Sequence, residues 1–583
     1  MSIEEIQKDG FSLQKAPDGE KDKVRAIPLK PALSENIRDF RDALFGEGEY
    51  SQRPYQQMPK VNAAKGLSQI IIRAPKEHAD TVDQAFGVLE EVLRSADSPD
   101  FSKHESGEAL RRILVNAPKD RSVRARRMMS DAVAKWGNGE ARDACASNLA
   151  DSMWRHPELV TSDEVQILAN EFARDKSNSW VIHRALKSVY KRPEFHNILT
   201  VGVADTLIDG LTKSRSLEGR DRRTRNYKDD LRDNVAQLAV SGHEKIGTHI
   251  CERLLDAFSG DSSKDVRYAA AEVVDSILYN GSSITTGQLL LLSKSAVSGN
   301  LPVLAGKHVD QRLQSILRRY PEKVTSNLLD VFRDGLLNAE GSDFGTDVPG
   351  LTSQYMAAGS LSAIASHGPE GLQDKAYQAL SDALRNGRDY GTKYWAHYGL
   401  LYDLKNKPPG MIDKTHDDMV SAIRDEPEGV TGDQLIELKQ WLLAGLVNVI
   451  KFSSQDVGVQ AVKDVIGLQR DKSLPEKVRR TIEAGFKGMN TSAVARSRME
   501  QAREDFAEDL NSGRTSDREK MAATSGLETL AKFASGGIAV PAIRDLLKAH
   551  DNKDLSQRVR GHLESVFDSL EKSGRASKFI AEL

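Results

Sequence analysis

Aromatic side chains gather in one stretch of the sequence, residues 390–402, which contains Tyr390, Tyr394, Trp395, Tyr398 and Tyr402. On a helix these residues fall on two stripes, one through Tyr394 and the other through Trp395 and Tyr398. A contact between neighbouring helices needs only one such stripe, and Tyr and Trp favour binding surfaces because they bring rigid area with a polar tip. We therefore predict that Tyr394, Trp395 and Tyr398 contact a protein or peptide partner. The alternative is an unusually bulky core between neighbouring helices.

Arginine and lysine are concentrated in two other stretches, residues 111–127 and 213–232. The second stretch is the denser one and centres on Arg220, Arg222, Arg223 and Arg225. Clusters of this kind neutralise phosphates or meet an acidic partner surface, so these four residues are candidates for partner binding. The competing interpretation is a solvated loop, on which the arginines pair with Asp221, Asp229, Asp230 and Asp233.

Side chains that bind metals or perform catalysis form no recognisable set. His243, His249 and Cys251 are close in sequence, but His249 and Cys251 point to different faces of a helix, so we predict no metal site. The stretch from Gly299 to Lys307 lacks the spacing of a phosphate loop. The sequence also lacks a nucleophile elbow, a zinc-protease helix and a dinucleotide fingerprint. We therefore expect a protein without catalytic residues or cofactors.

The composition limits the class of protein and its compartment. Lys and Arg number 82 against 85 Asp and Glu, so the net charge of −3 gives no general attraction to nucleic acid or anionic lipid. Cys145 and Cys251 are the only cysteines, which excludes a disulfide framework. No apolar run reaches the roughly 20 residues that span a bilayer, and residues 1–30 contain no apolar signal core. We predict a cytoplasmic protein; secretion into a host cell is the alternative, because a signal that is not cleaved would escape this test.

The elements that carry these side chains are predicted to be helices. From about residue 60 almost every segment repeats its apolar residues with helical period, and no convincing strand pattern is present. In the C-terminal part, helices pair as 456–469 with 476–486, 492–510 with 517–533, and 538–549 with 555–570. Further upstream, the second helices of pairs centre near Val235, Ala270, Asp310, Met356, Trp395 and Trp441. A spacing of roughly 40 residues is that of an α-solenoid, in which each hairpin stacks on the next and leaves a long open surface.

Two local marks recur in these hairpins. A polar turn contains Asp265, Asp471, Asp517 or Asp554, and a basic residue follows early in the second helix, at Arg267, Arg479, Arg518 or Arg560. With the hairpin spacing, these marks make most of the chain after about residue 100 resemble the HEAT/armadillo family of α-solenoids. The resemblance implies an all-α, right-handed solenoid of stacked two-helix repeats, in which an Asp/Arg ladder ties adjacent hairpins together. The spacing of the marks varies here, so a broken ladder is the alternative.

We predict three regions along the chain. Residues 1–60 form a flexible N-terminal arm with one docked helix over 34–45, because this region offers little that packs. Residues 61–160 form helical repeats whose pairing the sequence leaves open, and residues 161–583 form a HEAT-like solenoid of about ten hairpins. Long turns inside hairpins, at 214–227, 339–350 and 426–433, are expected to project from one rim, where loops often bind.

These features favour a non-enzymatic protein–protein interaction scaffold, which holds a protein or peptide partner on its concave surface and loop rim. One alternative is a nucleic-acid-binding protein similar to HEAT-like DNA glycosylases. In that case residues 111–127 and 213–232 would contact phosphates, and Trp136, Trp154 and Trp180 would stack against a base. A second alternative is a secreted bacterial effector that binds host proteins, since effectors with HEAT-like folds exist.

Overall fold

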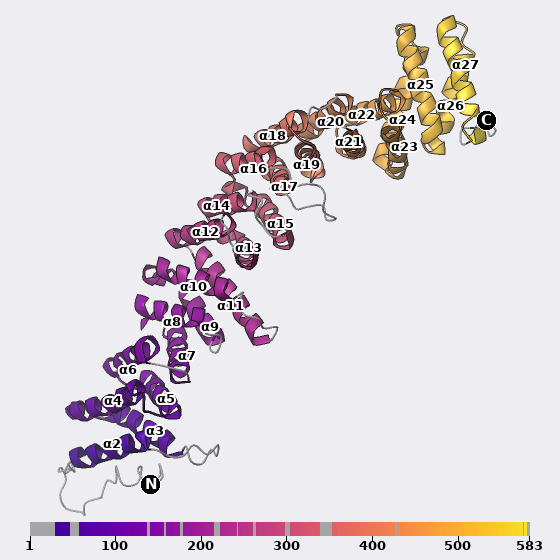
Figure 1. Ribbon diagram of the computed structural model, residues 1–583. Helices are drawn as coiled ribbons and strands as arrows, with labels where there is room; N and C mark the ends of the chain where they lie inside the picture. Colours follow the sequence, from indigo (N-terminus) through magenta and orange to yellow (C-terminus); the bar gives the residue numbers. More distant parts are fainter. Residues whose placement is uncertain are drawn as a thin grey trace, which may run out of the picture. The chain divides into compact units, whose positions relative to one another are not determined.

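In the computed structural model, every regular element of the described residues is a helix (Figure 1). The described residues are 29–46, 58–136, 140–156, 159–174, 179–214, 222–241, 243–259, 264–297, 303–338, 353–425, 430, 432–574 and 577–579. The prediction of an all-α protein is confirmed. Contacts between helices group the chain into two units, residues 1–253 and residues 254–583.

The first unit contains two layers of helices. Odd-numbered helices contact one another in order, α3 with α5, α5 with α7, α7 with α9 and α9 with α11, while α2 lies against α4 and α8 against α10. The helix predicted over 34–45 is α2, which packs on α3 and α4 and buries Ile37 and Leu44. The helices of this unit are α2 (Leu29–Phe45), α3 (Met58–Arg73), α4 (Ala79–Arg94), α5 (Asp100–Asn116), α6 (Lys119–Asp131), α7 (Glu140–Arg155), α8 (Ser162–Arg174), α9 (Ser179–Tyr190), α10 (Val201–Ser214) and α11 (Arg222–Val240). Helix α12 (Glu244–Ser259) contains the boundary between the units.

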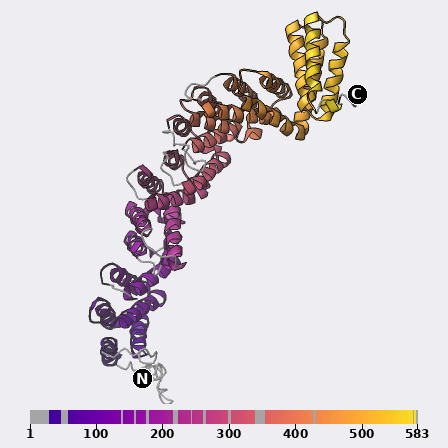
Figure 2. The ribbon, with the colours of Figure 1, turned by 45° about the vertical axis from the view of Figure 1, so that its right-hand side comes forward.

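The second unit repeats the two-layer pattern. Odd helices contact each other in order from α13 to α27, and even helices do so from α14 to α26. Figure 2 shows the last helices of this series side by side near the C-terminus. The helices are α13 (Lys264–Tyr279), α14 (Thr286–Val297), α15 (Val303–Arg319), α16 (Ser326–Asn338), α17 (Ser353–His367), α18 (Leu372–Asn386), α19 (Tyr390–Leu401), α20 (Pro409–Arg424), α21 (Gly432–Phe452), α22 (Gln455–Arg470), α23 (Glu476–Thr491), α24 (Ala493–Asn511), α25 (Asp517–Phe533), α26 (Gly536–His550) and α27 (Gln557–Glu571). Each predicted second-helix centre falls inside an odd helix, and the contacts within each unit confirm the predicted stacking of two-helix hairpins.

Local sequence signals set the ends and faces of these helices. At the start of α25, the Ser516 hydroxyl accepts the backbone N–H of Glu519, and the Glu519 carboxylate accepts the N–H of Ser516 at 2.7 Å. In α23, Val478, Ile482 and Phe486 recur at every fourth position and are buried, as their spacing predicts. Burying one such side chain stabilises the fold by roughly 1.5–3 kcal/mol. Because much of this burial occurs against the neighbouring hairpins, each hairpin depends on its neighbours for most of its stability.

Helix α17 is buried on almost every side. It contacts α15, α16, α18 and α19, and its sequence is rich in Ala, Ser and Gly, which let neighbouring backbones approach closely. At Gly359, an added Cβ would lie 2.4 Å from Nε2 of Gln314, so a larger residue there would displace the Gln314 amide. Tyr355 is the large exception near the start of α17, and it lies beside the aromatic residues of α19.

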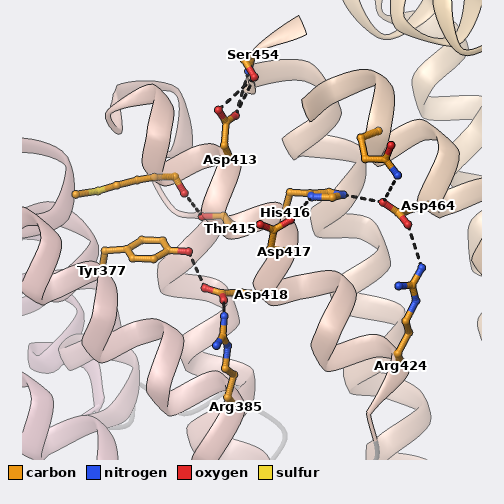
Figure 3. Close-up of polar contacts among 12 residues, drawn as sticks. Tyr377, Arg385, Asp413, Thr415, His416, Asp417, Asp418, Arg424, Ser454 and Asp464 are labelled. Carbon is orange, nitrogen blue, oxygen red and sulfur yellow. Dashed lines mark hydrogen bonds and ion pairs between the residues drawn. The ribbon is translucent and has the colours of Figure 1, made fainter. Parts of the chain in front are cut away.

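A ladder of charged hydrogen bonds links the even helices of the second unit. Figure 3 shows its first two steps: Tyr377 and Arg385 of α18 converge on Asp418 of α20, and His416 and Arg424 of α20 converge on Asp464 of α22. In each step the two donors are eight residues apart, so they share one face of the helix. The ladder continues with Lys463 to Asp505 at 2.7 Å and Arg503 to Asp545.

Two expectations about the hairpins need correction. The ladder is built from other residues than those expected from the resemblance: Asp471 accepts from the neighbouring Ser473, and Asp517 accepts from the Ser556 hydroxyl at 2.7 Å. The long turn expected over 214–227 is shorter, because α11 begins at Arg222. The turn at 339–350 and most of that at 426–433 lie outside the described residues.

Candidate functional site

Helix α19 is held firmly at both ends, which fixes the direction of its aromatic side chains. The carboxylate of Asp389 caps the first turn, where it accepts the backbone N–H of Thr392 at 2.8 Å. After the last turn, Asp403 adopts a left-handed backbone with φ of 56°, which stops the helix. The buried ammonium group of Lys407 then donates to the carbonyl oxygens of Gly399, at 2.8 Å, and Leu400.

Aromatic rings from three consecutive odd helices form one continuous cluster. The ring of Tyr355 on α17 lies 5.0 Å from Trp395 and 5.3 Å from Tyr398, centroid to centroid. On α19, Tyr394 lies 4.8 Å from Trp395, and on its other side it meets Trp441 of α21 at 5.9 Å. Edge-to-face and tilted pairs of this kind add roughly 0.5–1.5 kcal/mol beyond the area that they bury.

Two adjoining pockets open beside this cluster, and together we call them the groove. The first pocket, of about 380 Å³, is lined mainly by apolar surface, from Tyr394, His397, Tyr398, Leu401, Tyr402, Asp403, Trp441, Ala444, Gly445 and Asn448. The second pocket, of about 410 Å³, is more polar and is lined by Arg318, Leu401, Tyr402, Asp403, Leu404, Lys405, Asn448 and Phe452. The two pockets share four lining residues, so a single elongated ligand can occupy both.

A chain of hydrogen bonds runs from the groove into the interior. The hydroxyl of Tyr398 donates to that of Tyr355, which donates to the carboxylate of Asp310 on α15. Asp310 is only 2% exposed and also accepts from Gln314 at 2.7 Å. Burial raises the pKa of Asp310 to about 7, because the charged form is poorly solvated there. The groove therefore has a titratable carboxyl group behind its tyrosines.

The histidine of α19 is a structural residue. His397 is buried, and burial lowers its pKa to about 4, so its ring is neutral at neutral pH. Its Nε2 atom lies 2.9 Å from the position that a Cβ on Gly445 would occupy, so only glycine lets α21 approach α19 this closely. Among the residues that line the groove, we find no nucleophile beside a base.

Charged groups at the polar end of the groove hold one another in place. Arg318 lies 3.3 Å from a carboxylate oxygen of Asp403, and its guanidinium carbon lies 5.3 Å from the centroid of the Tyr402 ring. His367 and Asn406 also contact Asp403, at 3.1 and 2.5 Å. Burial alone would raise the pKa of Asp403, but these hydrogen bonds and the charge of Arg318 hold it below its ordinary value.

The structure brings the three predicted aromatic residues together but gives them different environments. Tyr394 and Tyr398 are half-buried and line the groove, whereas Trp395 is 5% exposed and supports them from behind. Sequence reasoning missed Tyr355, and it used Trp441, 44% exposed, only to mark a helix. A signal for both exists: Tyr355, Tyr398 and Trp441 are each 43 residues apart, so they occupy equivalent positions of successive repeats.

The basic stretch 213–232 falls largely outside the described side chains. Arg220 lies outside the described residues, and Arg222, Arg223 and Arg225 belong to the first turns of α11, where only the backbone is described. The binding role of these four arginines therefore stays a prediction.

Most described arginines of the stretch 111–127 bind groups of the protein itself. Arg121 is buried and donates to the carbonyl oxygen of Ile71 at 2.6 Å. Arg126 is buried against Glu164 at 2.7 Å, and Arg124 pairs with Asp83 and lies over the Phe86 ring. Arg111 pairs with Glu108 at 3.0 Å. The sequence cluster is thus divided between separate internal contacts.

The described residues contain no group of three His, Cys, Asp or Glu side chains placed to hold a metal ion. His249 instead contacts Asp205 at 2.9 Å, and burial raises the pKa of Cys251 to about 12, so its thiol stays protonated. Among the helices described, none has the length and apolar character needed to cross a bilayer.

Comparison with known proteins gives likeness of structure only. No protein-family model matches the chain, and no curated protein matches it by sequence. Among solved structures, a mutant of Kap121p aligns with 94% of this chain and 54% of its own length, at 13% identity and a TM-score of 0.41. The karyopherin Kap121p bound to the SUMO protease Ulp1p aligns with 97% of this chain and 67% of its own, at 10% identity and a TM-score of 0.39.

An engineered protein aligns over its whole length with 92% of this chain, at 15% identity and a TM-score of 0.23. The chain thus spans about half the length of the Kap121p mutant. Scores this low do not establish a common fold, so the helix contacts within each unit are what define the repeats.

Proposed function

We propose that this chain is a non-enzymatic protein-interaction scaffold that binds a peptide segment of a protein partner in the groove beside α19 and α21. One observation carries the proposal: two adjoining pockets of about 380 and 410 Å³ lie against aromatic rings at equivalent positions of successive repeats. Ligand pockets usually fall between roughly 300 and 1,000 Å³, so each pocket suits a large side chain rather than a whole domain.

The chemistry of the two pockets differs along the groove, which suits an extended segment. An apolar or aromatic side chain of the partner fits against Tyr394, Tyr398 and Trp441, where rigid rings lose little entropy on binding. Polar groups of the same segment meet Asn448 and Lys405 in the second pocket. The continuous aromatic support by Tyr355 and Trp395 keeps these contacts in place before the partner arrives.

Selection of displayed peptides on the full-length protein tests this proposal. Asn448→Arg places a long side chain where the pockets meet, and Trp441→Ala removes an exposed aromatic ring that lines the groove. Both substitutions should weaken the binding of the selected peptides about tenfold or more. Tyr279→Ala is the matched control, because it also removes an exposed aromatic side chain but does not line the groove. Peptides that bind Asn448→Arg as tightly as the wild type would exclude the groove as their site.

The nucleic-acid alternative receives less support from the described side chains. Arg121, Arg124 and Arg126 are engaged by a carbonyl oxygen or carboxylates of the protein, so they do not form a surface that neutralises phosphates. The same purified protein can be tested for binding to duplex and single-stranded DNA at two salt concentrations. Tight binding with steep salt dependence would favour this alternative over the groove.

A further inference from the structure

Three side chains of the first unit form a second exposed cluster that the groove does not use. Trp154 near the end of α7 is 37% exposed, and Trp180 at the start of α9 is 62% exposed. The guanidinium carbon of Arg184 lies 3.5 Å from the ring centroid of Trp154 and 5.6 Å from that of Trp180. The arginine is therefore placed between two indoles, and we call these three residues the indole–arginine cluster.

Arg184 differs from its basic neighbours in having no carboxylate partner among the described residues. Lys187, one turn later on α9, pairs with Asp233 of α11 at 2.6 Å, and Arg155 pairs with Asp151 at 2.9 Å. No described carboxylate lies within ion-pair distance of the Arg184 guanidinium, and its side chain is exposed. Stacking holds the plane of this group against an indole face and leaves its N–H edge open.

An N–H edge of this kind matches the two oxygens of a carboxylate, and the exposed indoles beside it match apolar side chains. We propose that the indole–arginine cluster is a docking surface for an acidic peptide segment of a protein partner. A carboxylate of the segment pairs with Arg184, and the apolar or aromatic side chains next to that carboxylate cover Trp154 and Trp180. This surface is separate from the groove and does not depend on it.

The charge around the cluster favours a peptide over a nucleic acid. Residues 140–214 contain nine Lys and Arg against eleven Asp and Glu, so the positive charge that the cluster offers a ligand is the local one of Arg184 and not that of a wider basic surface. Nucleic acids draw most of their affinity from several phosphates neutralised at once, which a single unpaired guanidinium does not supply. One charged pair beside apolar contacts is instead a common pattern at protein interfaces.

Fluorescence anisotropy on the full-length protein tests the proposal with three labelled probes of equal length. The probes are a peptide of alternating Asp and Phe, a peptide of alternating Asn and Phe, and oligothymidylate. The acidic peptide should bind, and Arg184→Ala should weaken its binding about tenfold, because the variant lacks the cation of a charge-assisted pair. Trp180→Ala should weaken it as well, and binding should quench the tryptophan fluorescence of the wild type.

Control variants test whether a loss of binding arises at the indole–arginine cluster or from a change elsewhere in the protein. Arg127→Ala, at an exposed arginine of α6, should leave binding of the acidic peptide unchanged. Circular dichroism of Arg184→Ala and of the milder Arg184→Gln should match that of the wild type. Equal binding of the Asn peptide, or unchanged binding by both Arg184 variants, would overturn the proposal. Preferential, steeply salt-dependent binding of oligothymidylate would assign the cluster to nucleic acid instead.

Discussion

The repeated residues of the two helix layers in the second unit have different roles: those of the even layer bind one another, and some of those of the odd layer line the groove. In the even layer, Asp418 and Asp464 each receive two donors from the preceding even helix, so the charges satisfy one another within the protein. In the odd layer, Tyr355, Tyr398 and Trp441 recur 43 residues apart, and Tyr398 and Trp441 line the groove. A network whose hydrogen bonds are all made stabilises the fold. Partly exposed aromatic side chains can still bury surface when a partner binds, and this burial contributes to the binding free energy.

The largest effect should come from removing the ring behind the groove. Trp395→Ala empties a buried site between Tyr355 and Tyr394, and we expect a loss of about 3–5 kcal/mol in the free energy of unfolding. Urea denaturation measures this loss. Trp395→Phe is the control and should cost much less, since the indole N–H has no hydrogen-bond partner among the described residues. A stable Trp395→Ala protein would mean that this ring is not part of the core.

Removing an acceptor from the ladder should lower the free energy of unfolding by a smaller amount and should leave the groove intact. Asp418→Ala removes the acceptor of the buried Tyr377 hydroxyl and of Arg385, and we expect a loss of about 2–3 kcal/mol in urea denaturation. Peptides selected on the groove should bind this variant as before. Arg424→Ala, which removes an exposed donor while His416 still contacts Asp464, should cost under about 1 kcal/mol. Equal losses in both variants would contradict the distinction between buried and exposed steps.

Adding one methyl group should have opposite effects on stability at the close contact of α19 with α21 and on an open helix surface. The added Cβ of Gly445→Ala would lie 2.8 Å from Leu401 and 2.9 Å from His397, so we expect a loss of about 1–3 kcal/mol. Gly467→Ala, in α22, meets nothing within 4 Å and should raise stability by roughly 0.5–1 kcal/mol through helix propensity. Thermal unfolding of the two variants should shift in opposite directions. A shift of the same sign in both would refute the close packing.

The last comparison concerns pH and the carboxyl group behind the groove, whose effect is spread over several pH units. The unfolded chain releases the Asp310 proton near the ordinary value of 3.8, whereas the folded chain holds it until about 7. The folded state therefore binds more protons across this range, and stability falls as pH rises through it. Asp310→Asn should lack this fall, which amounts to about 1.4 kcal/mol for each pH unit between the two values. His397 changes stability in the opposite direction at acidic pH, so the comparison is made as variant minus wild type, in which the His397 contribution cancels.

Much of the fold could be predicted because its signals are local. Helical period, caps and turns occur within a few residues, and the predicted second-helix centres at Asp310, Met356, Trp395 and Trp441 all fall inside odd helices. The site was predictable only in part. The aromatic stretch 390–402 identified the correct helix, but its pattern could not separate the buried Trp395 from the half-buried Tyr394, since both lie on stripes that face neighbouring helices.

The sequence alone determined that this chain is a series of amphipathic hairpins, because an apolar stripe at helical spacing is stable only against another stripe. Tertiary structure decided which side chains remain available. Arg121 meets the carbonyl oxygen of Ile71, and Tyr355 reaches Asp310, across distances in sequence that no local pattern encodes. How closely each helix approaches the next depends on the packing of whole faces. This packing opens the groove, and among the residues that the structure describes it leaves Arg184 against an indole ring and without a carboxylate partner.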